Sequence, residues 1–328
     1  MTPDGFSIST AIGRGAYGTI GGAGHRWVML AVAWLCLAVW CALPAMARFD
    51  HAHEQLTKEL QKYVDTPLVH YARWKNDQAG LDRYLKQLAA ISPREYERFT
   101  QDQKKALWIN AYNAITIKIV LTHYPIRGDK PYYPPNSLRQ IPNVWEDFKF
   151  TVAGKEVNLY MIEHDMIRKQ LQDARMHFAV VCASRGCPPL LNRAYVPETL
   201  DKDLDEAARR YFAAERNVQY DPERKEVRVS QLFRWFPLDF ANLAGFSKMP
   251  FPPPSDDAIV LSYVLSMAPA ELRSKFPEKE TRVLYMPFDW SLNDADATPV
   301  GDAQNKGVEW LTDGSMRAAT AGPCCGGP

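Results

Sequence analysis

The segment TQDQKKALWINAYNAITIKIVLTHYP, residues 100–125, carries the strongest structural pattern in the chain. Thr100 and Gln103 have the spacing of a capping box, in which each side chain bonds the other residue's backbone N–H, and Pro125 closes the segment. These signals predict one long helix. Apolar residues occupy most of its circumference, so we expect the helix to be largely buried.

Two asparagines, Asn110 and Asn113, are three residues apart and therefore share one face of this helix, beside Trp108 and Tyr112. Asparagine is a poor helix former and is costly to bury without hydrogen-bond partners. We therefore expect both side chains to have fixed partners. In one interpretation their amides hold a neighbouring loop. In the other, an amide orients a catalytic histidine or donates to an oxyanion.

The segments on either side of this helix alternate between helical periods and strand-like patterns. Their order predicts an α+β fold: a single domain with a mixed or antiparallel central sheet packed by helices, and an N-terminal half that is mainly helical. The predicted helices cover residues 51–63, 80–91, 158–171, 200–215 and 258–267, and residues 230–240 are predicted as a short helical or turn segment. The predicted strands and hairpins cover 148–157, 177–181, 218–230 and 282–294.

The N-terminus has the pattern of an export signal. An uncharged apolar run, WVMLAVAWLCLAVWCALPAMA, occupies residues 27–47 and ends in the small-x-small sequence Ala45-Met46-Ala47 after Pro44. We expect residues 1–47 to be a signal peptide; because the run is long enough to span a bilayer, an uncleaved anchor is the alternative. Both place the remainder outside the cytoplasm, as a periplasmic, secreted or membrane-anchored protein. Residues 48–294 then form the α+β domain, and 295–328 a disordered tail.

The charges nearly cancel, with 39 Lys and Arg against 38 Asp and Glu. No basic field indicates nucleic acid, so the expected partner is a small molecule or peptide, with membrane contact only through an uncleaved N-terminal segment. No cofactor or metal is expected. The spacing H-x4-C-x4-C at residues 177–187 matches no common zinc pattern.

The stretch HFAVVCASRGCPPL, residues 177–190, concentrates reactive side chains. Its continuous apolar start predicts a central strand, with His177 and Cys182 on opposite faces. Cys182 would then enter a tight turn whose backbone N–H groups could hold an oxyanion, with Arg185 favouring a thiolate and Ser184 close by. Two hypotheses follow: Cys182 is a nucleophile, or it forms a disulfide with Cys187 in an oxidising compartment.

A base for such a nucleophile would have to come from another element, because His177 is on the wrong strand face. His164 lies at the edge of the apolar face of the predicted helix 158–171, next to Glu163. Histidine titrates near neutrality and is the usual general base. The alternative is that His164 is a packed core residue.

Four sequence blocks resemble the signature blocks of the family called domain of unknown function 547. They are LWINAYNAITIKIVLTHYP, IEHDMIRKQ, RMHFAVVCASRGCPPL and FDWSLND, in that family's order, and the resemblance covers roughly residues 65–294. The family is similar to papain-like and transglutaminase-like thiol enzymes by analogy only, and here the histidine precedes the cysteine. The motif positions are Trp108, Asn110, Tyr112, Asn113, Glu163, His164, Cys182, Ser184 and Pro188.

Two functions are compatible with these residues. The first is an exported thiol-dependent hydrolase or transferase acting on an amide, ester or thioester. Its nucleophile is Cys182 and its base is His164. Orienting groups come from Glu163, Asn110 and Asn113, and binding or oxyanion groups from Trp108, Tyr112, Ser184, Arg185 and His177. The second is a non-catalytic envelope binding or structural domain with a buried Asn/His network and a Cys182–Cys187 disulfide.

Overall fold

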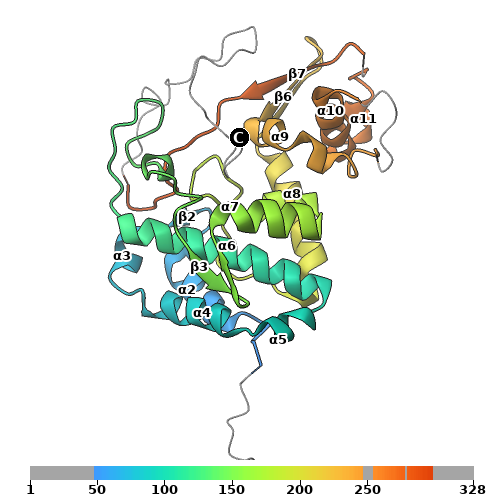
Figure 1. Cartoon of the computed structure of the whole chain (residues 1–328). Coiled ribbons are helices and arrows are strands. Elements are labelled where there is room, and N and C mark those ends of the chain that lie inside the picture. Colours follow the sequence, from blue (N-terminus) through green and yellow to red (C-terminus); the bar gives the residue numbers. More distant parts are fainter. Residues whose placement is uncertain (1–47, 247–253, 278, 298–328) are drawn as a thin grey trace, which may run out of the picture. The chain divides into compact units, whose positions relative to one another are not determined.

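The computed structural model describes residues 48–246, 254–277 and 279–297 (Figure 1). The predicted leader, residues 247–253 and nearly all of the predicted tail lie outside the described residues. Within those ranges, no helix is both long enough and apolar enough to cross a bilayer.

The long helix predicted from residues 100–125 is α6, Gln101–His123. The Thr100 hydroxyl accepts from Gln103 N at 3.2 Å and the Gln103 side chain accepts from Thr100 N at 2.9 Å, so the capping box is confirmed. α6 is buried on most sides and packs against neighbouring helices of the N-terminal half. Among these helices, α3 (Tyr71–Lys75) and α4 (Ala79–Ala90) contact α6, and α2 (Glu54–Tyr63) packs on α4. The short helix α5 (Pro93–Glu97) comes just before α6 in the chain.

The fold class is α+β, as predicted, with short sheets. The largest sheet is mixed: β5 (Val218–Asp221) pairs antiparallel with β6 (Glu226–Ser230), which pairs parallel with β7 (Arg282–Met286). Two further antiparallel pairs accompany it, β1 with β2 and β3 with β4. Their bounds are β1 Val64–Asp65, β2 Leu68–Val69, β3 Phe150–Val152 and β4 Lys155–Val157.

The apolar residues form two clusters. The first surrounds α6 and includes the fully buried Trp74, Trp108 and Tyr112. The second contains Phe178 and Phe233 and lies among the helices and the mixed sheet of the C-terminal half. Those helices are α8 (Leu200–Ala213), α9 (Gln231–Trp235), α10 (Asp256–Met267) and α11 (Ala270–Arg273), with the 3₁₀ turn η5 (Pro237–Phe240). Of two further 3₁₀ turns, η1 (Leu138–Gln140) contributes Leu138 to the first cluster, and η4 (Pro197–Thr199) contacts α6.

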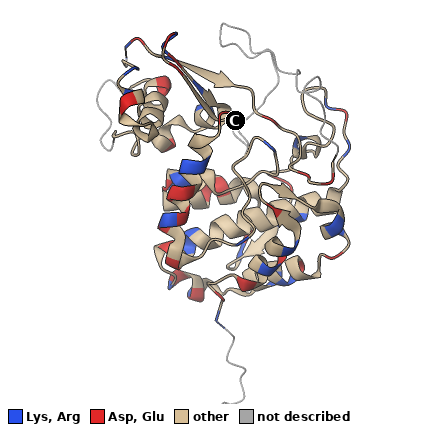
Figure 2. Ribbon diagram, turned by 180° about the vertical axis from the view of Figure 1, so that it is seen from behind, with Lys and Arg blue, Asp and Glu red and all other residues tan. Residues whose placement is uncertain are grey.

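Charged residues of both signs are interspersed along the helices. Figure 2 shows Lys and Arg beside Asp and Glu along the same helical segments, in agreement with the near-zero net charge of the chain. On α8, for example, Glu206 pairs with Arg210 at 2.7 Å. Exposed pairs of this kind contribute little to stability.

The strand predicted at residues 177–181 is wrong. The chain forms a 3₁₀ turn, η3 (Ala174–Phe178), and then runs without strand pairing until Ser184 makes an isolated antiparallel bridge to Leu292. The Asn113 side chain explains this, because it bonds Ala179 O and Val181 N, two backbone groups that a sheet ladder would otherwise use. The apolar run is buried as expected, with residues 179–181 in the cluster around α6 and Phe178 in the second cluster.

Two other predicted elements differ in detail. The helix 158–171 begins as α7 (Leu159–Met161) and continues as a π-helix, η2 (Ile162–Leu171). π-Helical turns are rare and are frequent at functional sites. The closing strand 282–294 is shorter than predicted, since β7 ends at Met286 and the rest pairs only through the isolated bridges Ser184–Leu292 and Val69–Asp294.

Candidate functional site

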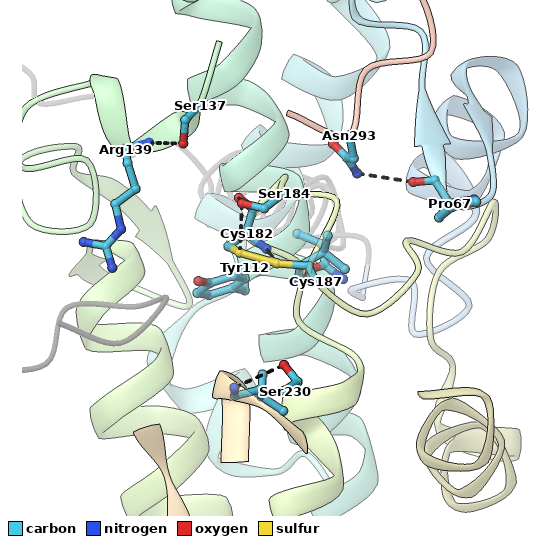
Figure 3. The surroundings of a disulfide bond; sticks show 12 residues. Pro67, Tyr112, Ser137, Arg139, Cys182, Ser184, Cys187, Ser230 and Asn293 are labelled. Carbon is cyan, nitrogen blue, oxygen red and sulfur yellow. Dashed lines mark hydrogen bonds between the residues drawn. A yellow bond between two sulfur atoms is a disulfide. The ribbon is translucent and has the colours of Figure 1, made fainter. Parts of the chain in front are cut away.

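The turn after η3 is closed by a disulfide between Cys182 and Cys187, with an S–S distance of 2.20 Å and a Cα–Cα distance of 6.4 Å (Figure 3). The two residues are 2% and 4% exposed. The Cys182 N–H donates to Cys187 Sγ at 3.2 Å. A bonded sulfur is not a thiolate, so Cys182 could act as a nucleophile only after reduction.

Three backbone N–H groups of this turn, which was predicted to supply oxyanion donors, are engaged inside the protein. Arg185 N donates to Ser291 O and Gly186 N to Asp289 O, each at 2.8 Å. Cys187 N donates to Ser184 O at 3.1 Å. Gly186 lies so close to the 289–291 segment that a Cβ there would be 2.9 Å from Asp289 N. The turn is therefore docked on the closing segment of the chain.

Both helix asparagines hold backbone of neighbouring segments. Asn110 accepts from Tyr195 N at 3.0 Å and donates to Tyr195 O at 2.7 Å. Asn113 accepts from Val181 N at 2.8 Å and donates to Ala179 O at 3.0 Å. The first interpretation of the pair, that their amides hold a neighbouring loop, describes this structure. Asn113 thereby fixes the chain that leads into Cys182.

The other motif residues on α6 and in the turn also have defined neighbours. Trp108 Nε1 donates to Tyr96 Oη at 2.8 Å, and Tyr112 Oη accepts from Trp145 Nε1 at 3.4 Å. Tyr112 lies beside the disulfide, and the Ser184 hydroxyl oxygen is 3.6 Å from Cys182 Sγ (Figure 3). The Arg185 side chain donates to Asp294 O at 3.1 Å, which ties it to the closing segment.

His164 is buried on η2, where its ring stacks on Tyr160 with centroids 4.2 Å apart. Its Nδ1 is 2.7 Å from an Arg168 guanidinium nitrogen. Arginine is a donor only, so His164 Nδ1 accepts and the ring proton is on Nε2. Glu163, its neighbour, is also buried. His164 is therefore the first member of a polar cluster that includes residues the sequence did not reveal.

Arg168 and Asp239 complete this cluster together with His177. Arg168 forms a two-point contact with Asp239, with Nη2 3.1 Å from Oδ1 and Nε on Oδ2, and its guanidinium lies 4.5 Å from the Phe236 ring. His177 Nε2 is 2.8 Å from the same Oδ2. The structure thus joins His164 to His177 through Arg168 and Asp239.

The electrostatics of this cluster follow from Asp239. Burial opposes ionisation, but hydrogen bonds from His177 and Arg168 overcome it and lower the pKa of Asp239 to about 2. The carboxylate is therefore ionised at neutral pH. Arg168, four residues after His164, could have been found from its helical spacing. Asp239 is distant in sequence and had no comparable signal.

The described residues contain no group of three or more His, Cys, Asp or Glu arranged to hold a metal ion. No curated protein and no solved structure matches the chain significantly. One family model does match, over residues 96–212, and this range contains α6, η2 and the disulfide-closed turn. These residues match the model of the family described as "Protein of unknown function, DUF547".

Proposed function

We propose that this protein is a non-catalytic binding domain that works outside the cytoplasm, in the periplasm or as a secreted protein. The observation that carries the proposal is the buried Cys182–Cys187 disulfide, which removes the one predicted nucleophile. Structural disulfides persist in oxidising compartments, so the bond also supports export through the apolar run at residues 27–47. The expected ligand is a small molecule or peptide.

The engaged amides and N–H groups support the same proposal. Catalytic oxyanion donors must be directed at the reacting atom. Here Asn110 and Asn113 bond backbone, and the N–H groups of Arg185 and Gly186 bond the closing segment. These motif residues maintain the shape of the domain.

A thiol-dependent hydrolase or transferase acting on an amide, ester or thioester is the second proposal, with Cys182 as nucleophile and His164 as base. The polar surroundings of Cys182 favour it, namely the nearby Ser184 hydroxyl and Tyr112 (Figure 3). Under this proposal the disulfide is a resting state that must be reduced before the enzyme acts.

Thiol mapping separates the two proposals. On the full-length native protein without reductant, iodoacetamide followed by peptide mass analysis is expected to leave Cys182 and Cys187 linked and unmodified. After reduction under denaturing conditions both should be alkylated. In a Cys187→Ser variant, which frees Cys182, slow alkylation at pH 7 agrees with a structural cysteine. Alkylation faster than that of free cysteine would support the enzyme, because it indicates a lowered thiol pKa.

The disulfide should also stabilise the fold. It closes a loop between residues five apart in sequence, and a loop of this size constrains the unfolded chain by about 2 kcal/mol. We expect the double variant Cys182→Ser, Cys187→Ser to lose about this much free energy of unfolding in urea titration. Addition of reductant should leave the variant unchanged and bring the wild type close to it. Equal stability of the two proteins would argue against a structural role.

A further inference from the structure

A polar groove lies where η2 and η3 face η5. One cavity of about 220 Å³ adjoins a second of about 270 Å³, and the two share five lining residues. The shared residues are Gln172, Asp173, Ala174, Asp239 and Asn242. Known small-molecule sites measure roughly 300–1,000 Å³. Each cavity alone is smaller than this, but the groove that the two form together is large enough for a small ligand.

His177 forms part of the wall of the first cavity although its side chain is only 3% exposed. Its Nε2 is directed at Asp239, and a carboxylate accepts hydrogen bonds, so Nε2 carries the proton. The other ring nitrogen, Nδ1, has no hydrogen-bond partner among the described residues. The groove therefore contains a ring nitrogen in a fixed position, and a ligand hydroxyl, which can both donate and accept, could bond to it.

The charges that line the groove cancel one another. Across both cavities three cationic side chains face three carboxylates, and each carboxylate is already paired. A groove neutralised in this way does not select for an anion or a cation. The pairs are Lys105–Asp173 at 2.7 Å, Arg175–Asp173 at 3.0 Å, Arg175–Asp205 at 2.6 Å and the Arg168–Asp239 contact.

Two exposed amides complete the lining, Gln172 and Asn242. Gln172 follows the π-helix in the left-handed region at φ 50°, and its N–H donates to Ile167 O at 3.0 Å. Strained backbone of this kind occurs preferentially at functional sites. An amide presents a donor and an acceptor side by side, which complements a pair of neighbouring hydroxyls. The rim adds an apolar surface, with Leu238 61% exposed.

We propose that this groove binds a neutral, polyhydroxylated ligand, a monosaccharide unit, through Gln172, Asn242 and His177 Nδ1. The inference rests on the proposed binding function and names its site and ligand class. Hydroxyls act as both donors and acceptors, so they can satisfy the two amides and the imidazole without an added charge. The Arg168–Asp239 contact holds the imidazole and the groove wall in place.

Saturation-transfer NMR on the full-length protein tests the site, with D-glucose, D-galactose and N-acetyl-D-glucosamine as separate probes. We expect transfer to at least one sugar. Gln172→Ala and Asn242→Ala should each weaken its binding about tenfold, the effect of one lost hydrogen bond. Gln170→Ala is the matched control, because Gln170 is an exposed glutamine two residues away that does not line the groove. Its affinity should equal that of the wild type.

L-alanine and acetate, a zwitterion and an anion, serve as competing probes. Binding of either one in place of the sugars overturns the ligand class, and no binding of any probe overturns the site. Sugar binding that survives in the Gln172→Ala, Asn242→Ala double variant also overturns the site. Failure of the proposed function looks different: the spectra would show a bound sugar being converted, or Cys182 would be alkylated in the native protein.

Discussion

Replacement of Asp239 by alanine is expected to lower the free energy of unfolding by about 3 kcal/mol at pH 7, at the lower end of the range for breaking a buried ion pair. The variant would leave the Arg168 guanidinium and the His177 ring without their shared acceptor. The lower end of the range applies because the Asp239 side chain is 21% exposed and water partly solvates the groups left behind. Urea titration followed by circular dichroism measures the change.

The free energy of unfolding lost in the Asp239→Ala variant should decrease as the pH falls. The pKa of Asp239 is lowered to about 2 in the folded protein, from an ordinary value near 3.8. The contribution of Asp239 to the free energy of unfolding is therefore fully present above the pKa that this carboxyl has in the unfolded chain, and it disappears as the pH falls through about 2. The difference between wild type and variant should be constant from pH 5 to 7 and shrink between pH 4 and 2.

Asp129→Ala is a suitable control for this series. Asp129 is exposed, and it forms no ion pair among the described residues, so its replacement should have little effect at any of these pH values. A stability difference for Asp239→Ala that grows towards acid pH would contradict the assignment of the carboxylate as the ionised centre of the cluster.

Sequence reasoning was most successful where the local signals are strong. The capping box at Thr100 and Gln103 and the closing Pro125 predicted the limits of α6, and the alternation around residues 218–230 predicted the β5–β6 hairpin. In these segments the backbone satisfies its own hydrogen bonds, so neighbours in sequence determine the structure.

The prediction of a strand at residues 177–181 failed for a physical reason. A short apolar run indicates burial, but its periodicity does not show which groups satisfy its backbone. Here the partner is a side chain, that of Asn113, which is 66 residues before Ala179. A long-range contact between a side chain and backbone leaves no periodic trace in the sequence.

In the candidate site, too, contacts between residues close in sequence were predictable and long-range contacts were not. The proximity of Cys182 and Cys187 was foreseeable, because only four residues separate them. The link from His164 to His177 was not, because it passes through Asp239 on a different element. His164 and His177, which were considered as alternative bases, belong to one hydrogen-bonded cluster, so the position of each ring depends on the other.

Replacement of Asn113 by alanine is expected to cost about 3 kcal/mol, because it leaves two buried backbone groups, Val181 N–H and Ala179 C=O, without their partner. Amide exchange of Val181 should accelerate relative to that of residues in α6. Asn110→Ala is the matched variant, since it removes the same two kinds of bond at Tyr195 and should destabilise without changing exchange at Val181.

The Asn113→Asp variant separates a structural from a catalytic role for this amide. A carboxylate still accepts from Val181 N but cannot donate to Ala179 O, so we expect it to destabilise the domain at neutral pH and to recover part of the loss when protonated. Asn113 also fixes the residues just before Cys182, so its loss should be non-additive with loss of the disulfide. Strict additivity, or an Asn113→Ala variant as stable as the wild type, would show that the turn keeps its shape without this amide.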